Sequence, residues 1–168
     1  MLETFDYLKN SKVVDELIKE FENSNEYDLS FKKSVFQSFY NPKKNLIKVL
    51  DGFGLEIKDS NGEVSGIQSQ ALGVLHEIGH AKVEKDIIEK YGLDSEEYNF
   101  YLEQKKGKNW PREENFVVKE YETPTAKELN EKLGASEPIR VSHQKFTPYE
   151  NTGEDVRTEG PTSTKRKN

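Results

Sequence analysis

The sequence predicts an α+β domain, in which a small mixed or antiparallel sheet packs on one long helix and further helices follow. Two segments, 11–22 and 70–91, repeat apolar residues every three or four positions, and two others, 29–40 and 45–51, alternate. A chain of 168 residues suits one domain with a real core. We expect this domain at 1–148 and a disordered tail at 149–168, which is rich in Thr, Gly, Glu, Ser and Lys.

The first half of the chain predicts one helix and several strands. Segment 11–22 follows Ser11, a good N-cap, and carries an apolar stripe of Val13, Val14, Leu17, Ile18 and Phe21. The "NPKK" between the two alternating segments is typical of a hairpin connection. Residues 51–70 contain four glycines, so we expect a loop there, with one short strand near 55–58.

The second half predicts helices. In segment 70–91, Leu72, Leu75, Gly79 and Val83 fall near one face, and Gly92 supplies the stop. Residues 94–110 indicate a short helix or a lid-like insertion. Pro111 can open the next helix, 111–121, which Pro124 is expected to break, and a further helix at 125–134 would be capped by Gly134.

Composition excludes several classes of function. The net charge of −6 disfavours nucleic acid, and the lysine clusters at 105–108 and 165–167 are expected to be solvated surface and tail. Without cysteine, any zinc site must use His, Asp or Glu. No apolar run is long enough for a membrane span, and no signal peptide is recognisable, which leaves export by another route or as part of a longer chain. We expect a monomer.

The stretch "ALGVLHEIGHAK" at 71–82 predicts a metal site. His76 and His80 lie four residues apart, so on a helix both imidazoles can face one ion. Glu77 lies about a hundred degrees round the helix, beside a metal-activated water rather than on the metal. The flanking residues are apolar, so the helix is expected to be buried, and a metal would offset the cost of burying the two histidines and Glu77. The small Gly79 and Ala81 would allow a neighbouring element to approach closely. The alternative is a surface helix with two solvated histidines.

A third ligand is expected from the acidic pair Glu113 and Glu114, which lies far enough downstream for the chain to return across the histidines. One of the two can ligate while the other supports a histidine from outside the ligand shell. The alternative is an acidic first helical turn favoured by the helix dipole. Asp86 is a weaker candidate, because Val83 indicates that the helix continues and carries it away. Glu120 and Glu122 are fallback ligands.

These motifs together resemble a known family. "LHEIGHA", then "EENFVV" about thirty-four residues later, then "IRVSH", resemble the catalytic light chains of botulinum and tetanus neurotoxins. They resemble more closely the NleD-type bacterial effector zinc peptidases and related toxin domains of large polymorphic bacterial proteins. The resemblance covers roughly residues 10–145.

The resemblance implies a zincin-like fold and a role for each motif residue. Glu114 would be the third zinc ligand, with Glu113 outside it, and Arg140 would stabilise the transition state. The family's tyrosine is His143 here, with Tyr149 as a substitute donor. The alternatives are a surface ion pair for Arg140, with Glu137 for example, and an ordinary loop histidine for His143.

The expected function is that of a zinc metallopeptidase, a hydrolase that cleaves peptide bonds in a protein or peptide substrate. By resemblance, it would be a bacterial effector or toxin domain, secreted without a signal peptide or carried on a larger protein, acting in the cytosol of a target cell and countered by an immunity or inhibitor protein. The alternatives are a catalytically silent, zinc-stabilised protein-binding module and a non-proteolytic zinc hydrolase. Retention of Glu77 favours an enzyme. The strand near 46–50 is expected to be either an exposed edge that binds extended peptides or an interior strand.

Overall fold

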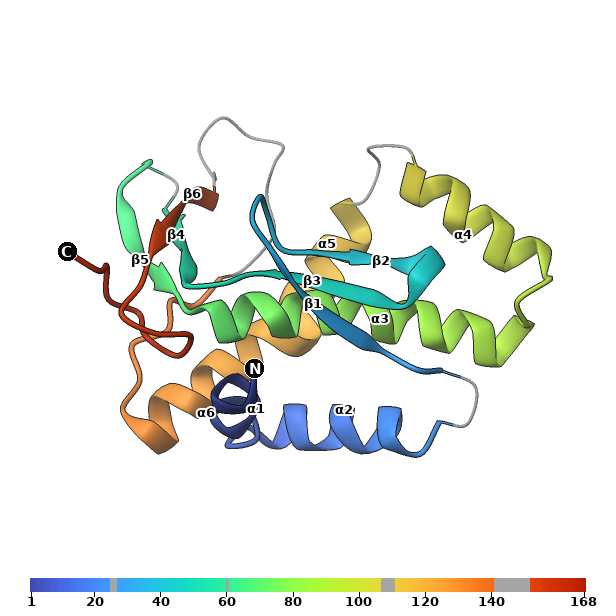
Figure 1. Cartoon of the computed structure of the whole chain (residues 1–168), viewed down its shortest axis with the longest axis horizontal. Helices are drawn as coiled ribbons and strands as arrows, with labels where there is room; N and C mark the ends of the chain where they lie inside the picture. The colour runs from blue at the N-terminus through green and yellow to red at the C-terminus, as the bar shows by residue number, and fades with distance from the viewer. Residues whose placement is uncertain (25–26, 60, 107–110, 141–151) are drawn as a thin grey trace.

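The computed structural model describes residues 1–24, 27–59, 61–106, 111–140 and 152–168. Its elements confirm an α+β architecture (Figure 1). They are, in order, α1 (Leu2–Leu8), α2 (Lys12–Glu22), β1 (Ser30–Ser34), β2 (Phe39–Asn41), η1 (Pro42–Lys44), β3 (Leu46–Leu50), β4 (Phe53–Lys58), β5 (Val64–Gln68), α3 (Gln70–Tyr91), α4 (Glu96–Lys106), α5 (Pro111–Val117), η2 (Val118–Glu122), α6 (Thr123–Leu133) and β6 (Thr152–Arg157).

Helix α3 is the central element. It begins after Ser69, whose hydroxyl accepts a hydrogen bond from the Leu72 amide, and it ends at Gly92, in agreement with the predicted helix. In Figure 1, α3 crosses the middle of the molecule, with β2 and β3 along one side, β1 passing across it, and α1, α2 and α6 on the other side. The interior residues Leu72, Val74 and Leu75 are fully buried in the hydrophobic core. Core packing therefore holds this helix, and the side chains that project from it, in a fixed position.

The first sheet has the order β1-β3-β2, with β1 parallel and β2 antiparallel to β3. The hairpin across "NPKK" is confirmed, since a 3-10 turn at Pro42–Lys44 joins β2 to β3. The single strand expected over 29–40 is wrong: the chain leaves β1, exposes Val35 and Phe36, and re-enters as β2. Segment 46–50 is the interior strand β3, so the free edges of this sheet are β1 and β2.

The second sheet has the order β5-β4-β6 and is antiparallel. Strand β5 lies within the predicted loop, and β6 lies within the predicted disordered tail. The tail prediction is therefore wrong for residues 152–168: β6 pairs with β4, and Pro161 accepts a hydrogen bond from the Ala71 amide at the start of α3. Polar composition misled the prediction because ladder hydrogen bonds use the backbone, whatever the side chain.

The C-terminal helices form one nearly continuous segment. Helix α5 passes through the π-helical turn η2 directly into α6, so the expected break at Pro124 is wrong. Pro124 lies in the first turn of α6, where the proline causes least disruption of helical hydrogen bonds. Gly134 ends α6 in the left-handed conformation (φ 63°), as predicted. In the parts of the chain that the structure describes, no helix has both the length and the apolar content needed to cross a bilayer.

Candidate metal centre

The two histidines of α3 face each other. One turn of helix separates His76 and His80, and their Nε2 atoms lie 3.2 Å apart. Both are buried, with exposed fractions of 9% and 3%. The surface-helix alternative is therefore wrong for this pair, and burial of two polar rings requires partners for all four nitrogens.

Helix α5 brings a carboxylate to the same point, because α3 has no side chain at Gly79. A Cβ atom there would lie 2.6 Å from Val117 Cγ1, so only glycine permits this approach. Glu114 Oε2 then lies 2.9 Å from His76 Nε2 and 3.5 Å from His80 Nε2. One ligand atom from each of these three residues falls within 4.8 Å of the others. The predicted ligand set is thus brought together.

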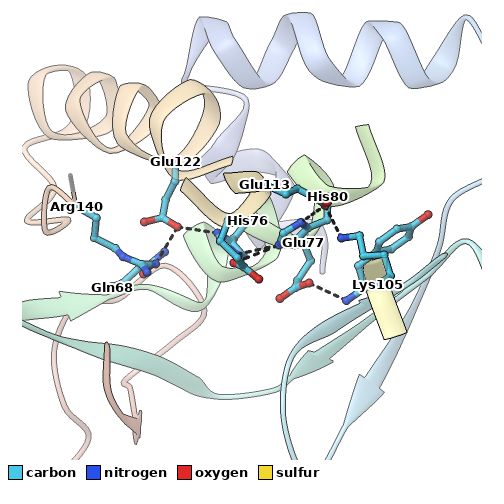
Figure 2. Close-up of polar contacts among 10 residues, drawn as sticks. Gln68, His76, Glu77, His80, Lys105, Glu113, Glu122 and Arg140 are labelled. Atoms are coloured by element: carbon cyan, nitrogen blue, oxygen red, sulfur yellow. Dashed lines mark hydrogen bonds and ion pairs between the residues drawn. The ribbon is translucent and has the colours of Figure 1, made fainter. Parts of the chain in front are cut away.

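Behind His76 lies a second carboxylate. The Nδ1 atom of His76 is 3.1 Å from Glu122 Oε2, and the same oxygen accepts a hydrogen bond of 3.1 Å from Arg140 Nη1 (Figure 2). Arg140 Nη1 also lies 3.3 Å from the Gln68 side-chain oxygen. Burial alone would raise the pKa of Glu122, but Arg140 and His76 outweigh it and hold that pKa below its usual range.

Behind His80 the arrangement is repeated with different residues. The Nδ1 atom of His80 lies 2.6 Å from Glu113 Oε1, and Lys105 of α4 donates to that same oxygen (Figure 2). The Lys105 ammonium also sits over the ring of Tyr101, 5.2 Å from its centre. Burial lowers the pKa of Lys105, against the opposing effect of Glu113. Each histidine is therefore backed by a carboxylate that is itself paired with a cation.

These contacts fix the ring orientation that a metal requires. Because each Nδ1 is next to a carboxylate, each Nε2 is directed at Glu114 and at the other ring. The charges are also suited to a dication. Four carboxylates, those of Glu77, Glu113, Glu114 and Glu122, surround the neutral rings, against two cations, Lys105 and Arg140. A divalent ion would balance the remaining excess of two negative charges, so the donor set fits a zinc ion with two nitrogen ligands and one oxygen ligand.

Without a metal, a proton on His76 supplies one of these two positive charges. Burial favours the neutral form of His76, but hydrogen bonds to Glu114 and Glu122 outweigh it and raise the pKa of His76 to about 10. The two imidazoles in turn hold the pKa of Glu114 well below its usual range, despite its burial. A metal would therefore have to displace a proton from His76.

Glu77 is outside this ligand group, as predicted. Its Oε2 atom accepts a hydrogen bond of 2.7 Å from the backbone amide of Tyr40 in β2. Figure 2 shows its carboxylate next to the histidines, on the side away from Arg140. The amide of Tyr40 consequently points away from β3 and toward α3.

The remaining candidates are placed elsewhere. Asp86 is paired with Lys82 on the exposed face of α3, and Glu120 is paired with Lys119 at 3.7 Å. Glu122 was considered as a ligand but supports His76 instead. Arg140 is buried against Glu122, so its predicted alternative, a surface pair with Glu137, is wrong. His143 and Tyr149 lie outside the described residues.

Sequence reasoning missed the role of three residues: Tyr40, Lys105 and Glu122. The eight-residue spacing between Glu114 and Glu122 is two turns of helix and was a usable signal for Glu122. The spacing of Tyr98, Tyr101 and Lys105 was another, since it marks one face of a helix. Tyr40 had no local signal, because its contact with Glu77 is made by the backbone.

No family model, curated protein or solved structure matches the chain. The resemblance to zinc peptidases consequently depends on the motif residues and their geometry alone.

Proposed function

We propose that this chain is a zinc endopeptidase with a zincin-like active site. The observation that carries the proposal is the convergence of His76, His80 and Glu114 on one point, with both histidines supported from behind. A purely structural site would not need the fourth carboxylate, Glu77, which lies next to the ligands without joining them.

The metal and the side chains of the protein would contribute different steps of the reaction. Zinc held by the three ligands would polarise a peptide carbonyl and lower the pKa of a water molecule. Glu77 accepts the proton of the attacking water and passes it to the leaving amine. The Tyr40 amide holds the Glu77 carboxylate in place for this transfer. Arg140 lies behind His76 and acts on the site through Glu122, the carboxylate that orients this ring.

A protein or peptide is the substrate class that this site suits. Strand β2 is an edge of its sheet and lies next to Glu77, which already accepts the Tyr40 amide, so an extended chain that added to this edge would lie close to the reacting atoms. The resemblance to effector and toxin peptidases supports a role against a protein of a target cell, with an immunity or inhibitor protein as a further partner.

The test combines metal analysis with one substitution. We expect about one zinc per chain and, in an unbiased cleavage-site screen on a cell lysate, cleavage by the parent protein. Glu77→Gln should keep zinc and lose activity by about 100- to 10,000-fold, because only proton transfer is removed. Glu97→Gln, on the exposed side of α4, is the matched control and should cleave normally.

Two results would count against a peptidase. If Glu77→Gln keeps zinc and cleaves as well as the parent, the proposed proton transfer is wrong. If the parent binds zinc but cleaves nothing, the zinc-stabilised binding module is the better account.

A further inference from the structure

Helix α4 carries three buried side chains on one face. Tyr98, Tyr101 and Lys105 follow at intervals of three and four residues, so they line up toward α3. Tyr98 and Tyr101 are each 8% exposed, and the side chain of Lys105 is 6% exposed. Phe100, on the opposite face, is 66% exposed. The polar ends of Tyr98 and Lys105 are each part of a hydrogen-bonded chain.

The first chain runs from α4 to the general base. Tyr98 donates a 2.6 Å hydrogen bond to Glu84, a fully buried carboxylate one turn beyond His80 on α3. The hydroxyls of Tyr27 and Tyr40 also bond to Glu84. Tyr40 is thereby held by its side chain, and its backbone amide is the donor to Glu77.

The second chain runs from α4 to a metal ligand. Lys105 donates to Glu113, and Glu113 accepts from the Nδ1 of His80. Lys105 and Tyr98 are seven residues apart, two turns of the same helix, so both chains start from one rigid element. No other helix in the described part of the chain is bonded to both Glu84 and Glu113 through side chains from one face.

We infer that α4 is a positioning helix, which holds Glu77 through Tyr98, Glu84 and Tyr40, and holds His80 through Lys105 and Glu113. Tyr98 and Lys105 are positioning residues, because neither needs to touch the substrate. The two chains are separate, so each has its own measurable effect. The Lys105 chain sets metal affinity, and the Tyr98 chain sets the placement of the general base.

Zinc affinity tests the Lys105 chain without any activity assay. In the full chain, competition with a chromophoric chelator should show about tenfold weaker zinc binding for Lys105→Met, the lower end of the effect usual for groups behind a metal ligand. Lys105→Arg keeps the charge and should restore most of the affinity. Glu97→Gln should bind zinc as the parent does. If Lys105→Met folds, as judged by circular dichroism, and binds zinc with parental affinity, the hydrogen bonds that join Lys105 to Glu113 and His80 do not set the metal affinity.

Amide exchange tests the Tyr98 chain. The Tyr40 amide is protected by its bond to Glu77, so Tyr98→Phe should speed its hydrogen exchange several-fold in the zinc-loaded protein. Glu84→Gln should do the same, and Glu97→Gln should not. Unchanged Tyr40 exchange in a folded Tyr98→Phe protein would overturn this part of the inference.

Turnover is a further readout and rests on the proposed peptidase. Tyr98→Phe and Tyr40→Phe should lower kcat by roughly tenfold while KM and zinc affinity stay at parental values, because a displaced general base affects the chemical step only. If both variants keep the parental kcat, the Tyr98 chain does not position Glu77. If the parent itself cleaves no peptide, the peptidase proposal fails, while zinc affinity and Tyr40 exchange still decide the role of α4.

Discussion

The two sides of the candidate metal centre have the same geometry but are built from different residues. Behind His76, Glu122 pairs with Arg140, with side chains that are 2% and 5% exposed. Behind His80, Glu113 pairs with Lys105, with side chains that are 16% and 6% exposed. Arginine stays protonated in proteins, whereas a buried lysine can lose its proton. The cation behind His76 therefore keeps its charge, whereas the cation behind His80 can lose it.

This difference separates two roles within one site. Glu122 and Arg140 join η2 to the segment after α6, so the His76 side is part of the way the domain folds. Glu113 and Lys105 join α5 to α4, so the His80 side depends on a peripheral helix. We expect substitutions on the His76 side to reduce stability most, and those on the His80 side to reduce metal binding most.

The largest effect is expected from Glu122→Gln. The substitution leaves the buried Arg140 guanidinium without its counter-charge, which costs about 3–5 kcal/mol when one partner of a buried pair is removed. The free energy of unfolding, measured by urea denaturation of the zinc-free protein, should fall by that amount. Glu113→Gln is the matched control on the other side and should cost much less, because Lys105 can release its proton. Equal losses for the two variants would contradict the proposed difference between the sides.

Sequence patterns predicted the residues of this site that lie close together along the chain. His76, Glu77 and His80 follow from the spacing of one helix, and Gly79 indicated the close approach of a second. The pair Glu113 and Glu114 was found as candidate ligands because it opens the next helix. These signals are short-range, and they depend on helical periodicity, which tertiary contacts rarely override when a segment is long and apolar.

The next effect is a pH dependence of stability and of zinc binding that originates from His76. The pKa of His76 is raised to about 10 in the zinc-free protein, above the unfolded value near 6.5. This group therefore stabilises the zinc-free fold fully below pH 6.5, and its contribution is lost as the pH rises toward 10. Zinc must displace one proton, so its apparent affinity should rise about tenfold per pH unit, or about 2.7 kcal/mol between pH 6.5 and 8.5. Chelator-buffered zinc titrations at several pH values measure this slope. A slope of zero would mean that His76 is already neutral.

The third prediction concerns metal binding on the His80 side. Glu113→Gln should weaken zinc binding by about 10- to 100-fold, because the neutral amide supports the Nδ1 proton of His80 less strongly than a carboxylate does. Chelator competition gives the affinity, and the melting temperature of the zinc-free protein serves as the control for folding. Parental zinc affinity in a folded Glu113→Gln protein would show that Glu113 does not act on the metal site.

The other half of the site could not be read from the sequence because its contacts are long-range. Arg140 was expected at the reacting atoms, but it lies against Glu122, which arrives through the π-helical turn that the sequence did not predict. Tyr40 reaches Glu77 by a backbone amide, which leaves no residue signature. The tail 152–168 was expected to be disordered, yet its strand completes a sheet, since backbone pairing is independent of side-chain composition. Periodicity describes one element at a time, whereas these features depend on how elements meet.

The smallest effect is expected from Gly79→Ala, a substitution that should affect the His76 and His80 sides of the site equally. The added methyl group would lie 2.6 Å from Val117 Cγ1 and 3.1 Å from Tyr121 Cδ2, so the segment that carries Glu113, Glu114 and Glu122 must move away from α3. Overpacking of this kind costs about 1–3 kcal/mol, and the better helix propensity of alanine returns about 1 kcal/mol, so a net loss of roughly 1 kcal/mol is expected. Zinc affinity should fall as well, because Glu114 retreats from both rings. Gly73→Ala, at a position with open space on the same helix, is the matched control and should not destabilise the protein. If Gly79→Ala lowered stability but left zinc binding unchanged, the close helix contact would not be what holds Glu114 at the two histidines.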